Sequence, residues 1–243
     1  ILGASKGFIG IENNKPDAIE SMKKAVSGET NIQVCALEVK YPQGAEKMLI
    51  KAAVGREVPP RGLPMDVGVV VHNIGTAVAI YEAVRYGKPL IERVVTVTGE
   101  GIKEPKNLMV KIGSLVSDLI KECGGFKSDI AKVISGGPMM GFALYSLDVP
   151  VTKGTSGILV LLEEEVVHIE DFGPCIRCGR CIDICPMGLM PSMLSVLSER
   201  GFYEEAKDYN LFDCFECGSC AYVCPSKRPI VQLVRLAKSL VKP

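Results

Sequence analysis

Apolar and polar positions divide the first third of the chain into short β-branched runs and longer amphipathic stretches. Each apolar run indicates a strand, and the spacing that follows it indicates a helix. The three pairs cover residues 8–12 and 16–27, 32–40 and 45–54, and 66–71 and 75–86. This alternation predicts an α/β layer with a mainly parallel sheet. Ligands gather at the carboxyl ends of the strands in such sheets, so the loops at residues 41–46 and 72–76 are candidate ligand loops.

The pattern changes in the middle of the chain. Two predicted strands are followed by an amphipathic helix that ends in a glycine pair, and then by two more strands. These elements cover residues 93–101, 104–113, 114–125, 132–137 and 157–165. A hairpin, a helix and further strands predict a small β-grasp-like α+β unit. The glycines of ISGGPMMG, residues 134–141, mark a tight turn with a close backbone approach.

The last third of the chain has helical spacing only. Residues 186–213 show it with a break at Gly201, and residues 229–240 form an amphipathic stretch whose apolar stripe we expect to pack in a core. The predicted fold class is therefore multidomain, with an α/β, an α+β and a small all-α part. We place the domain boundaries at residues 1–88, 89–165 and 166–243.

Composition narrows the function classes. Of 243 residues, 47% are hydrophobic and 23% are charged, as in ordinary globular proteins. Lys plus Arg and Asp plus Glu each number 28, so charge gives no indication of a nucleic-acid partner. No apolar run reaches the ~18 residues that a bilayer span needs. The chain begins ILGASKGF without an initiator methionine or a signal sequence, which is typical of the middle of a protein.

Eight of the ten cysteines form two runs with the spacing C-x2-C-x2-C-x3-C-P. The first cysteine run is Cys175, Cys178, Cys181 and Cys185, and the second is Cys214, Cys217, Cys220 and Cys224. This spacing is typical of two-cluster ferredoxins, in which the last cysteine of each run binds the other run's [4Fe–4S] cluster. We therefore assign Cys224 to the cluster of the first three cysteines, and Cys185 to the cluster of Cys214, Cys217 and Cys220. The expected function is one-electron transfer in a reducing, cytoplasmic compartment.

Two other uses of cysteine fit the pattern less well. Zinc sites also use paired C-x2-C motifs, but the x3-C-P ending has no role in them. Disulfides are typical of small secreted scaffolds, which this chain does not resemble. Cys35 and Cys123 stand alone in apolar surroundings, and we expect both to be buried structural thiols.

In this order, the three segments resemble the RnfC family, the C subunits of the Rnf electron-transport complex, and, more distantly, the flavoprotein subunit of respiratory complex I. The resemblance covers the whole chain. Besides the cysteine runs, it is carried by GFIGIENNKPDAI (7–19), YPQGAEK (41–47), VHNIGT (71–76) and ISGGPMMG (134–141). It implies a flavin–NAD(H) domain, a soluble-ligand-binding β-grasp (SLBB) domain and a two-cluster ferredoxin domain.

The resemblance also implies cofactor-binding residues. Asn73 and Thr76 would lie near the phosphate of FMN, and Tyr41, Gly44 and Glu46 near the flavin ring and the nicotinamide of NAD(H). Local structure explains several of them equally well, because Asn73 is a good helix N-cap and Glu46 suits the first turn of a helix. The chain departs from the complex I pattern at Ala45 and His72.

The resemblance implies partners as well. They are NAD(H) and the other subunits of a membrane electron-transport complex, at the inner face of the cell membrane, with no direct insertion by this chain. The family's Gly-rich FMN loop lies upstream of residue 1, so we expect this segment alone to bind FMN and NADH poorly and to be inactive with NADH. Two alternatives stay open: a cobalamin reductase of similar architecture, and a non-catalytic ferredoxin-like adaptor that only relays electrons.

Overall fold

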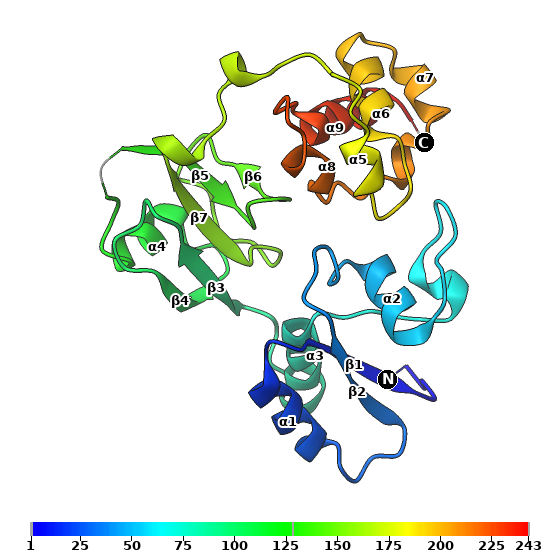
Figure 1. Cartoon of the computed structure of the whole chain (residues 1–243). Helices are drawn as coiled ribbons and strands as arrows, with labels where there is room; N and C mark the ends of the chain where they lie inside the picture. Colours follow the sequence, from blue (N-terminus) through cyan, green and yellow to red (C-terminus); the bar gives the residue numbers. More distant parts are fainter. Residues whose placement is uncertain (1, 128, 243) are drawn as a thin grey trace.

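The computed structural model describes residues 2–127 and 129–242, and its three parts follow one another along the chain (Figure 1). The first part contains β1 (Gly7–Glu12) and β2 (Ile32–Leu37), which pair in parallel from Gly7↔Ile32 to Glu12↔Leu37. The crossover between them is α1 (Pro16–Ala25), which begins at a proline, a residue suited to the first helical turn. Two more helices follow, α2 (Glu46–Val54) and α3 (Ile74–Tyr86).

The predicted third strand of this part is wrong. Residues 66 and 67 are the last two of the 3-10 helix η1 (Pro64–Val67), and residues 68–71 form no strand. Gly68 has a φ of 68° and its N–H donates to Met65, which turns the chain at the end of η1. The sheet in the described residues of this part has only β1 and β2, so the valines at 69–71 have no neighbouring strand with which to pair.

The second part is a five-stranded mixed sheet in the order β4-β3-β7-β5-β6. Its elements are β3 (Glu92–Thr98), β4 (Lys106–Lys111), α4 (Val116–Glu122), β5 (Ile130–Ser135), β6 (Phe142–Ala143) and β7 (Gly157–Leu162). The strand β7 is parallel to β3 and antiparallel to β5. Buried residues of α4 and of the central strands form one core, which includes the fully buried Val95, Val97 and Val160.

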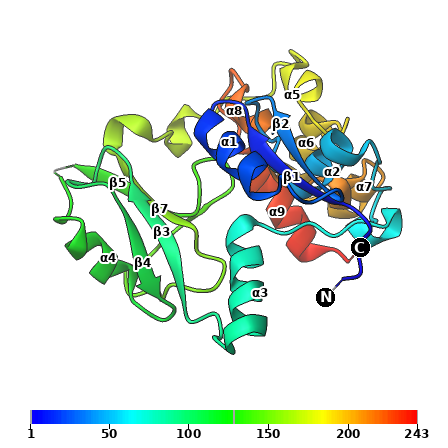
Figure 2. The ribbon, with the colours of Figure 1, turned by 90° about the horizontal axis from the view of Figure 1, so that it is seen from below.

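The third part, residues 166–242, consists of short helices and connecting loops. Its α-helices are α5 (Arg180–Asp183), α6 (Pro191–Glu199), α7 (Tyr203–Lys207), α8 (Ser219–Tyr222) and α9 (Ile230–Leu240). The apolar stripe of α9 packs in a core with α6 and α7, as the spacing predicted, and Val234 and Ala237 are buried there. In Figure 2 the helices of the third part lie behind the first part, and the mixed sheet lies to the left of both. Every described helix is too short or too polar to cross a bilayer.

Candidate functional site

The two cysteine runs adopt the same backbone conformation. The residue before the second cysteine of each run has a left-handed φ, 56° at Arg177 and 62° at Glu216. The glycine after that cysteine is also left-handed, with φ 80° at Gly179 and 86° at Gly218. Each glycine then precedes a single-turn helix, α5 or α8. The sequence repeat is therefore a structural repeat, with two similar loops that each wrap around a cavity.

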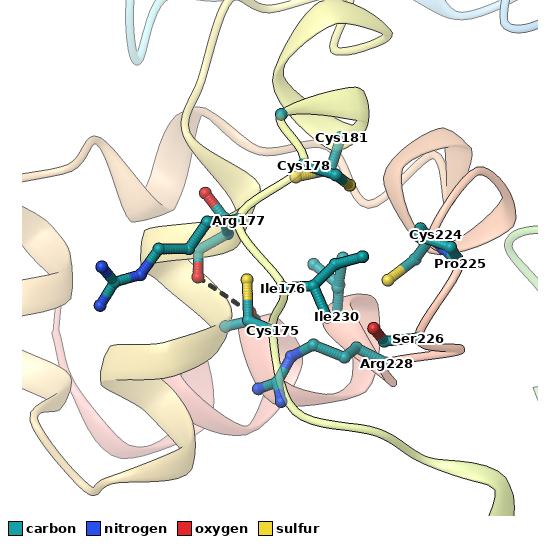
Figure 3. Close-up of a pocket in the computed structure, with 13 residues that line it drawn as sticks. Cys175, Ile176, Arg177, Cys178, Cys181, Cys224, Pro225, Ser226, Arg228 and Ile230 are labelled. Carbon is teal, nitrogen blue, oxygen red and sulfur yellow. Dashed lines mark hydrogen bonds between the residues drawn. The ribbon is translucent and has the colours of Figure 1, made fainter.

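The eight cysteines are divided between the two cavities in a crossed manner. The first cavity is lined by Cys175, Cys178 and Cys181 together with Cys224, as Figure 3 shows. The second cavity is lined by Cys214, Cys217 and Cys220 together with Cys185. The structure thus brings together the same two sets of four that the sequence assigned to two clusters.

The residues around the cavities fit the chemistry of an iron–sulfur cluster. Among the described residues, no three thiol, imidazole or carboxylate groups are close enough to hold a single metal ion. Four thiols distributed around a cavity suit a larger group, and thiolates are the ligands that iron–sulfur clusters select. Arg228 lines the first cavity, and its buried Nε has no hydrogen-bond partner in the described part of the chain. The inorganic sulfides of a cluster are acceptors for such a donor.

Burial controls the protonation of several of these thiols. Desolvation raises the pKa of Cys181 and Cys214, and it raises the pKa of Cys220 to about 12. These three groups are therefore uncharged thiols near neutral pH when nothing is bound. They would have to lose their protons to serve as cluster ligands, which would couple assembly of a cluster to release of protons.

The second cavity has charged neighbours that are partly shielded from solvent. Burial alone would raise the pKa of Glu216, but hydrogen bonds from Arg235 and Lys238 outweigh this effect and lower it. Glu216 is therefore a carboxylate at neutral pH. In the described part of the first run, the equivalent residue Arg177 is exposed and forms no ion pair.

A third cavity, of about 620 Å³, lies where the three parts of the chain meet. Three of the predicted flavin residues, Tyr41, Gly44 and Glu46, line it. The second part contributes Met140 and the third part contributes Phe215. Sequence reasoning missed these last two residues. In the sequence, Met140 is marked only by the ISGGPMMG turn and Phe215 only by its position within the second run. Neither feature indicates which loops lie together in the folded chain.

The other two predicted flavin residues do not line this cavity. Asn73 is the N-cap of α3, and its Oδ1 accepts a hydrogen bond from the N–H of Gly75 at 2.9 Å. Thr76 lies in the first turn of the same helix and is exposed, as is Asn73. Of the two lone cysteines, Cys123 is buried as expected, whereas Cys35 is only partly buried.

Family models match the chain in three consecutive places. Residues 1–82 match the Nuo51 FMN-binding domain, residues 94–143 the SLBB domain and residues 174–227 the 4Fe-4S dicluster domain. These matches follow the three parts of the structure in order.

Curated relatives match almost the whole chain. The C subunit of the proton-translocating ferredoxin:NAD(+) oxidoreductase complex of Clostridium ljungdahlii is 59% identical over 98% of this chain and 52% of its own length. The C subunit of the Na(+)-translocating complex of Acetobacterium woodii is 48% identical over 98% of this chain and 53% of its length. The C subunit of the ion-translocating oxidoreductase complex of Rhodobacter capsulatus is 47% identical over 98% of this chain and 46% of its own length. The chain thus spans about half the length of these relatives.

The fold is similar to that of a solved structure. It is an NAD+-reducing [NiFe]-hydrogenase in the H2-reduced state, with a TM-score of 0.57 over 99% of this chain and 50% of the matched chain. The sequence identity is 14%, so this likeness concerns the arrangement of the elements alone.

Proposed function

This chain is a homologue of the C subunits of ion-translocating ferredoxin:NAD(+) oxidoreductase complexes, and on that premise we propose that it relays single electrons through two [4Fe–4S] clusters. The resemblance seen in the sequence is confirmed over nearly the whole chain. The observation that carries the proposal is the gathering of four cysteines around each of two cavities.

The proposed ligands follow from these cavities. The first cluster is held by Cys175, Cys178, Cys181 and Cys224, and the second by Cys214, Cys217, Cys220 and Cys185. Each cluster supplies a one-electron redox centre. The chain binds it, limits its access to water and orients the thiolates through the left-handed backbone at Gly179 and Gly218. Because each proposed set takes its last cysteine from the other run, two bound clusters would tie the two loops together.

FMN and NAD(H) are the proposed two-electron partners in the full-length protein. The third cavity is the candidate flavin and nicotinamide site, with Tyr41, Gly44 and Glu46 on its wall. Asn73 and Thr76 remain candidates for the FMN phosphate at the N-terminus of α3, where free N–H groups and the helix dipole favour an anion. Two contacts support the second cluster as the flavin's neighbour: Phe215 lines the third cavity, and the Tyr41 hydroxyl bonds the carbonyl of Cys217.

The proposed partners are the remaining subunits of a membrane complex, together with NAD(H). The names of the relatives support this assignment, because they describe ion-translocating complexes. We place the protein at the cytoplasmic face of the membrane, held there by those subunits. The adaptor alternative differs in one respect, since an adaptor would carry electrons without accepting them from NADH.

Two measurements test the proposal. The anaerobically reconstituted protein should bind about eight iron and eight sulfide per chain, and dithionite should produce the EPR signals of reduced [4Fe–4S] clusters. A stable content of about four iron or fewer would contradict two clusters. The full-length protein with FMN should reduce an artificial acceptor with NADH. If two clusters are present but NADH gives no reduction, the adaptor function is the correct one.

A further inference from the structure

Three charged side chains form a compact group next to the second cavity. Glu216 lies between Cys214 and Cys217 in the second run, and Arg235 and Lys238 lie one turn apart on α9. Arg235 Nε is 2.8 Å from Glu216 Oε2, and Lys238 Nζ is 2.9 Å from Glu216 Oε1. The three side chains are only 19–24% exposed, so solvent screens them weakly. Together they carry one net positive charge.

This group contacts a proposed cluster ligand directly. Lys238 Nζ also donates a hydrogen bond to the main-chain carbonyl of Cys214. The N–H of Glu216 lies 3.4 Å from Cys214 Sγ. Lys238 and Glu216 therefore hold the first ligand of the second run at two points, its carbonyl and its sulfur. A displaced lysine would alter both the local charge and the position of that ligand.

Arg235 fixes the group from its other side. Its Nη2 donates to the carbonyl of Met140 at 2.9 Å, and its guanidinium lies 4.3 Å from the centroid of the Phe142 ring. Both contacts belong to the segment from the β5–β6 turn into β6, which packs so closely that a Cβ on Gly218 would lie 2.8 Å from the carbonyl oxygen of Met139. Because two domains hold the guanidinium, the orientation of Glu216 depends on their docking.

The first cavity has no such group among the described residues. Arg177 replaces Glu216 at the equivalent position, with nearly the same φ, and its side chain is exposed. The buried cation at the first cavity is Arg228, from the loop before α9, and its carboxylate partner Glu199 is half exposed. The electrostatic surroundings of the two cavities are thus built from different residues, although their cysteine loops are alike.

We propose that Arg235 and Lys238, oriented by Glu216, are positioning residues that set the reduction potential of the second cluster separately from that of the first. This inference rests on the proposed function, because it requires a cluster in each cavity. Reduction adds one negative charge to a cluster, and a nearby shielded cation stabilises that charge. Loss of the lysine charge therefore lowers the potential, and loss of the glutamate charge raises it.

An EPR-monitored redox titration of the full-length, reconstituted protein tests this. We expect Lys238→Met to lower the potential of one of the two reduction steps. At a fixed potential, the oxidised-to-reduced ratio of that cluster should rise at least tenfold, which corresponds to about 59 mV for a one-electron couple. We expect Glu216→Gln to shift the same step in the opposite direction. The step that disappears in Cys185→Ala identifies the second cluster. Lys207→Met is the matched control, because Lys207, like Lys238, bonds one glutamate and one main-chain carbonyl. Its partners are Glu204 and the carbonyl of Lys242.

Each outcome supports or overturns the proposal. Opposite shifts of the second step alone support it, and a role in folding alone would not produce them. Unchanged steps, equal shifts of both steps, or shifts of one sign in the two variants would overturn it. If Lys238→Met loses iron, Glu216→Gln decides by its sign, since only a rise agrees with the proposal. Failure of the proposed function is distinct, because the unmodified protein would then lack cluster signals.

Discussion

Tyr41 Oη donates a hydrogen bond to the main-chain carbonyl of Cys217 at 2.5 Å, although the two residues are 176 positions apart. Burial, with a smaller contribution from Cys217, raises the pKa of Tyr41 above its usual value, so the phenol remains a neutral donor well above neutral pH. This bond joins the wall of the third cavity to the second cysteine run. It therefore connects the candidate flavin site to a candidate cluster.

Removal of that hydroxyl should loosen the link without disturbing cluster assembly. We expect Tyr41→Phe to lower the free energy of unfolding by about 1 kcal/mol, the usual worth of one hydrogen bond. We also expect slower reduction of the clusters by NADH in the full-length protein, at unchanged iron content. Urea unfolding and stopped-flow absorbance measure the two effects. Tyr81→Phe is the control, because its hydroxyl contacts only Tyr86 on the surface of α3 in the described structure; an equal effect there would contradict the prediction.

Two glycines at equivalent positions of the cysteine runs should respond differently to alanine. Both have a left-handed φ, 80° at Gly179 and 86° at Gly218, so each substitution costs about 1 kcal/mol of backbone strain. A Cβ on Gly179 meets no atom within 4 Å, whereas one on Gly218 lies 2.8 Å from the carbonyl oxygen of Met139.

Gly218→Ala should therefore also displace the turn between β5 and β6. We expect a larger loss of unfolding free energy than for Gly179→Ala and faster proteolytic cleavage within residues 136–142. Denaturant unfolding and limited proteolysis of both variants check this. Equal stability and equal cleavage would show that the turn does not dock against the second run.

The cysteine spacing predicted both sets of four residues that share a cavity. Three members of each set lie three positions apart on one loop, and the fourth follows from the crossed pattern of two-cluster ferredoxins. The strand predicted at residues 66–71 failed because a strand also needs a neighbour, and hydrophobic spacing does not show whether one exists. The strand β6, two residues long, is too short to produce a periodic signal. Met140 and Phe215 were missed because the third cavity depends on the docking of three domains.

The crossed ligand assignment predicts which pairs of cysteine substitutions are additive. Cys178→Ala and Cys224→Ala affect the same cavity, so the double variant should still hold about four iron, like each single variant. Cys178→Ala with Cys185→Ala affects both cavities, and it should hold almost none. Iron and sulfide analysis after anaerobic reconstitution measures this. The reverse result, with about four iron retained by the Cys178 and Cys185 pair, would mean that each run binds its own cluster.

Arg228 should control how firmly the first cluster is held. Its side chain lines the first cavity and is 6% exposed, Nη2 bonds Glu199 at 2.8 Å, and Nε is without a partner in the described residues. A cluster sulfide gives this buried donor an acceptor, and a hydrogen bond to a charged group contributes about 1.5–3 kcal/mol. We therefore expect Arg228→Met to speed release of iron from the first cluster to a chelator by at least about tenfold.

Arg180 is a suitable comparison, because it belongs to the same run but is exposed and does not line the cavity. Arg180→Met should release iron at the rate of the unmodified protein, and in Arg228→Met the second cluster should keep its normal rate. Absorbance at the cluster bands during chelation follows both phases. If Arg228→Met speeds both phases equally, the arginine stabilises the helical domain as a whole. A change confined to the first cluster's phase would instead assign Nε to that cluster, because a general loss of folding stability exposes both cavities together.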